Sequence, residues 1–301
     1  MKRKEYGLAS RLKKSAVSYA MMAPYMIVFI LLTVIPVIAA ICLSFTYFNM
    51  LEPPKFTGFL NYERLFLDDE IFPQVLKNTL VFAIITGPLS YLISFVSAWL
   101  INEMGRAVRT VMTFCFYAPA LCGNLYAIWA MILSGDQYGI ANSVLMQLGV
   151  ISEPQQWLSD PKTMLGALIT VQLWASFGVG FLTFIAGFQS MDKSLAEAGG
   201  IDGIKNRWQE LWFITLPQLK PQLMFGAVMS ITGAFTVGNV GAMLCGNPST
   251  EYAVHTLVNH MTDYATVKYE FGYACAIATL LFLAMIACNE LIKLLLKNVG
   301  R

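Results

Sequence analysis

Six long stretches of the chain contain no Asp, Glu, Lys or Arg, and this feature limits the possible folds most strongly. Crossing a bilayer takes about 20 apolar residues, and six uninterrupted runs of this length have no counterpart in soluble proteins. The predicted spans are residues 18–44, 78–101, 110–134, 164–190, 221–245 and 271–292. We therefore expect an all-α, polytopic membrane protein, with one transmembrane domain of six helices over residues 1–301.

The distribution of charge predicts how these spans are oriented. Basic residues accumulate on the cytoplasmic side of membrane proteins. An N-terminus inside the cell puts 15 of the 20 Lys and Arg residues in the cytoplasm. The five exceptions are Lys55, Arg64, Lys77, Lys162 and Lys268. Both termini are therefore predicted to be cytoplasmic, with the long loop 192–220 on the inner side.

The inner loop has the local signals of two short helices. Ser194 and Glu197 have the spacing of a capping box, in which each side chain satisfies a free amide at a helix start. Gly203 is expected to end this first helix, because glycine takes a positive φ without strain. Asn206 with Gln209 repeats the capping pattern. Local physics alone allows either a solvated connection or a docking element.

The same loop resembles the EAA signature of the permeases of binding-protein-dependent ABC importers. That pattern is E-A-A, three residues, G, nine residues and I-x-L-P. The positions that match are Glu197, Ala198, Gly203, Ile214, Leu216 and Pro217. Gly199 replaces the second alanine, and ten residues separate Gly203 from Ile214. We expect the extra residue in the turn of residues 204–206.

Two outer segments resemble the carbohydrate-uptake branch of this family, whose best-known example is the maltose F subunit. One begins F-T-G-F-L-N-Y-E-R-L-F at Phe56, and the other is G-N-P-S-T from Gly246. The resemblance implies a type I importer permease fold in the cytoplasmic membrane of a bacterial cell. It also implies a sugar or oligosaccharide substrate and a rocking motion of the spans between inward-open and outward-open states.

The resemblance further implies the partners of the chain. No G-x4-G-K-[ST] phosphate loop occurs, so ATP hydrolysis is expected in a separate ABC ATPase dimer rather than in this non-catalytic subunit. A homologous second permease and an extracellular solute-binding protein complete the expected assembly in the lipid bilayer, with no nucleic acid. The residues expected to couple to the ATPase are Glu197, Ala198, Gly199, Asp202, Gly203, Ile214, Leu216 and Pro217.

A second class of function is a secondary transporter or channel for a small polar solute. Such proteins usually carry ionisable groups inside the membrane, and the centres of the six spans lack them. Coupling to sodium through backbone carbonyls stays open. A membrane-embedded enzyme is the third alternative, but His255 and His260 do not form an H-E-x-x-H pattern. The six cysteines show no C-x2-C spacing, so we expect no metal and no cofactor.

Polar and aromatic residues within the spans are candidates for the substrate path, because sugars need hydrogen-bonding groups and aromatic faces. Those with helical spacing are Tyr117, Asn124, Gln172, Trp174, Ser176, Thr232, Thr236 and Asn239. The alternative for each is a hydrogen bond between neighbouring helices, which averages about 0.6 kcal/mol. Kinks are expected at Pro36, Gly87–Pro88 and Pro119.

Overall fold

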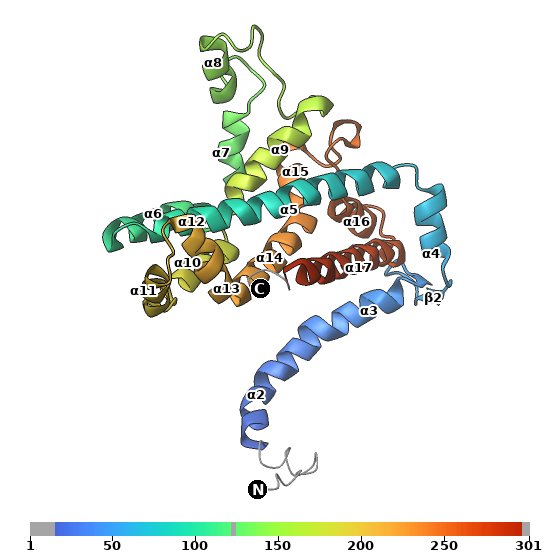
Figure 1. Cartoon of the computed structure of the whole chain (residues 1–301). Helices are drawn as coiled ribbons and strands as arrows, with labels where there is room; N and C mark the ends of the chain where they lie inside the picture. Colours follow the sequence, from blue (N-terminus) through green and yellow to red (C-terminus); the bar gives the residue numbers. More distant parts are fainter. Residues whose placement is uncertain (1–15, 122–124, 297–301) are drawn as a thin grey trace.

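The computed structural model describes residues 16–121 and 125–296, and these residues form an assembly of helices (Figure 1). The longer helices are α2 (Ala16–Phe29), α3 (Ile35–Leu43), α5 (Phe72–Asn102), α6 (Arg106–Leu121), α7 (Leu125–Ile132), α8 (Ile140–Gln147), α9 (Pro161–Ala175), α10 (Val179–Gln189), α11 (Lys193–Ile201), α14 (Lys220–Phe235), α15 (Asn239–Cys245), α16 (Leu257–Thr266) and α17 (Phe271–Leu296). The shorter ones are α4 (Leu60–Glu63), α12 (Arg207–Glu210), α13 (Leu216–Gln218) and the 3-10 turn Thr250–Tyr252. Three π-helical turns occupy Ile30–Val34, Arg64–Asp68 and Leu211–Thr215.

The described residues contain four to six helical segments that are long and apolar enough to cross a bilayer. Four helical runs are long and apolar enough to cross a bilayer, namely Val17–Leu43, Phe72–Asn102, Pro161–Gln189 and Phe271–Leu294. Two bent pairs, α6 with α7 at 93° and α14 with α15 at 42°, raise the number to six if each pair forms one crossing. The all-α architecture agrees with the sequence-based prediction, but the third and fifth crossings are not straight helices.

The breaks in the helices do not occur at the prolines. Helices α5 and α6 continue through Pro88 and Pro119, and Pro36 lies in the first turn of α3. A π-helical turn precedes Pro36, and such turns are found where the regular hydrogen-bond ladder is interrupted. The fourth crossing is interrupted between Ala175 and Val179, and the fifth between Phe235 and Asn239.

Helix α5 lies at the centre of the bundle and packs against α10, α14 and α9. The contact with α10 is aromatic, because the rings of Phe95 and Phe184 lie 5.5 Å apart at 88°. A Cβ atom at Gly226 would lie 2.4 Å from Cζ of Phe184, so α14 approaches α10 closely only because this residue is glycine. Small residues at such contacts let membrane helices pack by van der Waals attraction.

The strands β1 (Thr46–Tyr47) and β2 (Lys55–Phe56) form an antiparallel pair at one end of the bundle. We call this end the β end, and the end with loop 192–220 the loop end. Asn61 connects the pair to α4, because its Nδ2 atom donates to the carbonyl oxygens of Ser44 and Thr46. The β end therefore holds the start of α5, all of α16 and the start of α17 (Figure 1).

The first crossing stands apart from the bundle. In Val17–Leu43, no residue of the most apolar stretch of 18 residues is buried against the rest of the chain. Helix α3 packs on α17 and α2 curves away from the other helices (Figure 1). An apolar helix of this length is stable only if lipid or another protein covers it.

Candidate functional site

The first candidate site is the loop 192–220, whose helix α11 has an N-cap that the sequence prediction missed. The carboxylate of Asp192 accepts a hydrogen bond from the backbone amide of Ser194 at 3.0 Å. The predicted capping box of Ser194 and Glu197 is therefore wrong, since α11 begins at Lys193 and Asp192 is its N-cap. A carboxylate suits this position because it also meets the positive end of the helix dipole. The bond from Ser194 lowers the pKa of Asp192.

The predicted end of α11 is confirmed. Asp202 is the C-cap, and the next residue, Gly203, has a φ of +96°. Backbone in this region is strained for any residue with a Cβ atom. The second predicted cap is also present, since Oδ1 of Asn206 accepts the amide hydrogen of Gln209 at 2.8 Å.

Gly199 explains how α11 packs against the following segment. It is buried, and a Cβ atom there would lie 2.4 Å from Cδ1 of Ile214. Ile214 belongs to the π-helical turn Leu211–Thr215, a form that takes one residue more per turn than an α-helix. Leu216 and Pro217 follow, both half-buried, and Ala198 is exposed.

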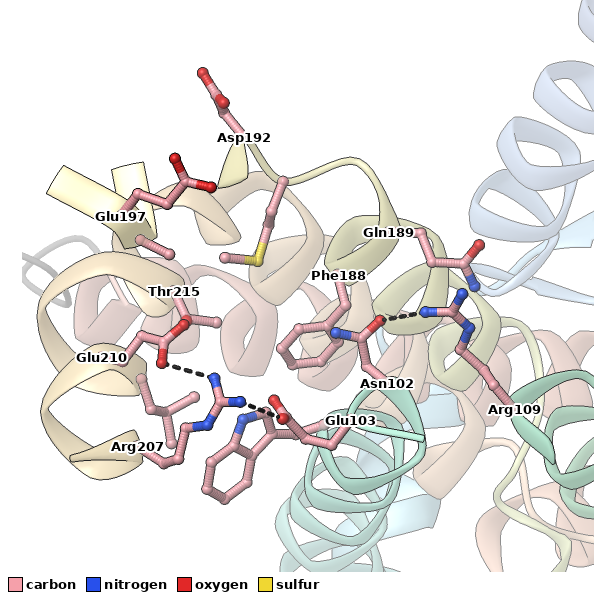
Figure 2. Close-up of a pocket in the computed structure, with 14 residues that line it drawn as sticks. Asn102, Glu103, Arg109, Phe188, Gln189, Asp192, Glu197, Arg207, Glu210 and Thr215 are labelled. Atoms are coloured by element: carbon pink, nitrogen blue, oxygen red, sulfur yellow. Dashed lines mark hydrogen bonds and ion pairs between the residues drawn. The ribbon is translucent and has the colours of Figure 1, made fainter. Parts of the chain in front are cut away.

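A cavity of about 560 Å³ lies between this loop and the ends of α5 and α10 (Figure 2). On one side, the guanidinium of Arg207 bonds to Glu103 at 2.8 Å and to Glu210 at 2.9 Å. Glu197 and Asp192 lie on the α11 side. The cavity is therefore lined by side chains of both signs of charge.

A second cavity, of about 180 Å³, lies in the middle of the bundle where α9 breaks before α10. Its polar lining residues are Thr86, Ser90, Ser94, Gln172, Ser176 and Ser230. The hydroxyls of Thr86, Ser90 and Ser176 donate to carbonyls of their own helices, so their oxygen lone pairs can still accept. The lining contains no charged side chain. Broken helices at mid-membrane are typical of solute sites in transporters.

The structure brings only some of the predicted path residues together. Gln172 and Ser176 line the polar cavity. Trp174 instead packs edge-on against Trp129, with ring centroids 5.5 Å apart, and lines a separate apolar cavity of about 410 Å³. Tyr117 is half-buried on α6. These positions are compatible with a substrate path beside α9, but the four side chains do not line one common cavity.

The other predicted path residues lie near the break between α14 and α15. Thr232 is half-buried, and its carbonyl accepts a hydrogen bond from the exposed Thr236 at 2.8 Å. Asn239 is exposed and is the first residue of α15. Asn124 lies outside the residues that the structure describes.

Sequence reasoning missed the hydroxyls of α5. Thr86, Ser90 and Ser94 recur every four residues and so share one face of a helix. This spacing was the signal that could have identified them. Their buried position follows from the packing of α5 against α10 and α14.

The two histidines lie at the β end. His255 and His260 are buried, and Nε2 of His260 is 2.9 Å from Oδ2 of Asp69. Among residues 16–121 and 125–296 no group of three or more His, Cys, Asp or Glu side chains is arranged to hold a metal. His260 therefore belongs to a hydrogen-bonded network with Asp69, whereas both ring nitrogens of the buried His255 lack a hydrogen-bond partner in the described part of the chain, and its Nε2 lies 3.4 Å from Oδ2 of Asp263.

Comparison with known proteins shows what this chain is similar to. The family described as binding-protein-dependent transport system inner membrane component matches residues 90–301. A probable ABC transporter permease protein, YesP of Bacillus subtilis, is 31% identical over 272 residues, which are 88% of this chain and 85% of that protein. The arabinooligosaccharides transport system permease protein AraP of the same organism is 29% identical over 278 residues, with 92% and 87% covered. The lactose transport system permease protein LacF of Rhizobium radiobacter is 28% identical over 250 residues, with 78% and 82% covered.

The fold is also that of a solved importer subunit. A chain in the crystal structure of a bacterial ABC transporter involved in the import of the acidic polysaccharide alginate aligns with a TM-score of 0.74. The identity is 20%, and the alignment covers 98% of this chain and 100% of that one. A second structure, of the alginate transporter with its pentasaccharide-bound periplasmic protein, gives a TM-score of 0.75 at 21% identity.

Proposed function

The chain belongs to the inner membrane components of binding-protein-dependent transport systems, and we propose that it forms half of the sugar pore of an ATP-driven importer. It is a multi-pass permease subunit of the ABC transporter class. Its residues 1–301 form one transmembrane domain in this proposal, with loop 192–220 as the coupling element.

The polar cavity between α5, α9 and α14 carries the assignment of a sugar as substrate. It offers hydroxyls and the Gln172 amide without any charge, which suits a neutral polyol better than an ion or an acid. Relatives named for arabinooligosaccharides and lactose support the same class of substrate. The cavity of about 180 Å³ is lined by residues of this chain, and in this proposal a facing subunit completes the path.

The uncovered first crossing supports a second, homologous permease as this facing subunit. Residues along its length, such as Leu31 at 57% and Leu32 at 66%, stay exposed in the isolated chain. A second permease packed beside this chain would cover part of this surface, and lipid the remainder.

Exposed apolar side chains on α11 support contact with an ATPase dimer. Leu195 and Ile201 are 48% and 88% exposed beside Glu197 and Asp202. Apolar anchors surrounded by polar groups are typical of protein interfaces. In this proposal α11 docks on the ATPase, while a solute-binding protein delivers the sugar at the β end.

ATP-driven uptake in proteoliposomes tests the proposal. The chain is purified together with the second permease and the ATPase encoded beside it, and the complex is reconstituted into liposomes that contain ATP. Uptake of radiolabelled arabinotriose, lactose and maltotriose is then measured in the presence of the matching solute-binding protein. We expect uptake of at least one sugar that requires ATP and stops with a non-hydrolysable analogue. Uptake driven by a sodium or proton gradient without ATP would instead support a secondary transporter.

The orientation of the chain is proposed from its basic residues, with both termini in the cytoplasm of a bacterial cell. Single cysteines at positions 68 and 202, on a cysteine-free background, can be labelled with an impermeant thiol reagent. We expect labelling from outside intact cells at position 68 alone. Labelling at position 202 from outside would show that the chain has the opposite orientation.

A further inference from the structure

Loop 192–220 is connected to the bundle by two physically different routes. Helix α11 packs on the π-helical turn, with Gly199 beneath Ile214, and this turn continues through α13 into α14. Movement of α11 can therefore reach α14 along the chain itself. Helix α5 ends at Asn102, 90 positions before the loop begins at residue 192, so it can follow a movement of the loop only through side-chain contacts.

Two side-chain contacts join the loop to the end of α5. The guanidinium of Arg207 lies 2.8 Å from a carboxylate oxygen of Glu103, the residue that ends α5 (Figure 2). The ring of Trp208 lies 5.2 Å from that of Trp99 at 58°. Both contacts join α12 to one turn of α5, so together they fix the position of the loop beside that helix.

The side chain of Arg207 is held in place by its own helix. Its Nη1 atom donates to Oε2 of Glu210 at 2.9 Å, while Nη2 lies toward Glu103. The planar guanidinium can meet two carboxylates at once, which a lysine ammonium does less specifically. Glu210 thus orients the guanidinium of Arg207, and Glu103 forms the ion pair that joins it to α5.

The exposure of this pair limits what it can do for folding. The side chains of Arg207 and Glu103 are 63% and 40% exposed, and exposed pairs contribute little to stability. Yet α5 carries Thr86, Ser90 and Ser94 of the polar cavity. A contact at the Glu103 end of α5 therefore acts on the same helix that lines the polar cavity.

We propose that Arg207 is a positioning residue that transmits movement of the inner loop to α5 through Glu103. This inference rests on the proposed importer function. When the ATPases move α11, α14 follows through the backbone and α5 follows through the Arg207–Glu103 pair. Loss of the pair would leave ATP hydrolysis intact but less productive.

The test measures ATP hydrolysed per sugar imported by the whole reconstituted importer, with the best substrate of the panel above. Arg207→Gln and Glu103→Gln should each raise this ratio by about two- to five-fold, the range that an exposed ion pair can supply. The double variant should go no further than either single variant, because residues that act as a pair are not additive. Arg207→Lys should recover part of the coupling.

Glu290→Gln is the matched control, because it removes an exposed ion pair of the same i,i+3 kind, Glu290 with Lys293 on α17, and leaves Arg207, Glu103 and Glu210 in place. It should leave the ratio within the wild-type range. The proposal is overturned if both single variants match wild type, if their effects add in the double variant, or if Glu290→Gln raises the ratio equally. Absence of ATP-driven uptake in the wild type would refute the importer function itself.

Discussion

Oδ2 of Asp69 lies 2.9 Å from Nε2 of His260, although 191 residues separate them in the chain. The same oxygen accepts a hydrogen bond from the hydroxyl of Tyr273 at 2.6 Å, and Oδ1 accepts the amides of Ile71 and Phe72. One carboxylate thus joins the start of α5 to α16 and α17. The β end is held by this buried polar network as well as by apolar packing.

Asp69→Asn should destabilise the β end. Burial by itself would raise the pKa of Asp69, but the hydrogen bonds of His260 and Tyr273 and the charge of His260 hold the pKa well below its usual value. The stabilisation is therefore present at neutral pH and is lost only as the pH falls through this lowered pKa. We expect a loss of about 2 kcal/mol, measured by thermal unfolding in nanodiscs. Glu52→Gln, which breaks an exposed pair with Lys55, serves as a control that should unfold like wild type.

His255 makes the stability depend on pH in a different range. Burial lowers the pKa of this imidazole from 6.5 to about 4, although Asp263 acts to raise it. Between these values the unfolded chain binds a proton that the folded chain does not, so stability should fall by about 3 kcal/mol as the pH drops. His255→Phe keeps the aromatic contact with Tyr252 and cannot titrate. Its melting temperature should change less than that of wild type between pH 7 and pH 4.5, and identical changes would contradict the assignment.

Gly203→Val should uncouple the loop from the ATPase. Nothing lies within 4 Å of a Cβ atom at this position, so the cost comes from the φ of +96° rather than from a clash. A residue with a Cβ atom there costs roughly 1–2 kcal/mol, whereas asparagine tolerates positive φ better. We expect Gly203→Val to lose co-purifying ATPase and Gly203→Asn to retain most of it. Gly200→Ala, in the same helix region with a free Cβ position, should behave as wild type.

Gly199→Ala restores the family's alanine but should weaken this particular loop. The new methyl group would lie 2.4 Å from Cδ1 of Ile214 and 3.0 Å from Cδ1 of Ile204. Overpacking of this kind costs typically about 1–3 kcal/mol, less when a side chain can move. The added variant Ile214→Val removes the clashing methyl and should recover ATPase binding and uptake. No recovery in the double variant would show that the glycine serves another purpose.

Gln172→Leu and Ser94→Ala test the polar cavity as part of the sugar path. Each removes a polar group from the lining, and losing a hydrogen bond to the sugar of roughly 1.4 kcal/mol would slow uptake about ten-fold. Membrane insertion and ATPase association should stay intact. Thr170→Val is the matched control, since Thr170 is exposed on α9 and its hydroxyl donates to Gly166. Uptake equal to wild type in Gln172→Leu and Ser94→Ala would show that the cavity is not part of the sugar path.

Much of the architecture follows from the sequence because a bilayer imposes strict local conditions. The charge-free runs predict apolar helices in the regions where the structure has them, and the positive φ of Gly203 was expected from its place at the end of α11. The family signature identified the loop despite Gly199. Each of these features depends on residues that are neighbours in the chain.

The tertiary structure decided the features that depend on contacts between distant segments. The helices break between Ala175 and Val179 and between Phe235 and Asn239, and the hydroxyls of α5 line the same cavity as Gln172. The join of Asp69 to His260 and that of Arg207 to Glu103 are equally invisible in the sequence. The cap of α11 at Asp192, by contrast, is a local contact that the sequence prediction assigned to Ser194. Hydropathy sets which segments enter the membrane, but the register of one helix against another is set by close packing of side chains, as where Phe184 lies against Gly226.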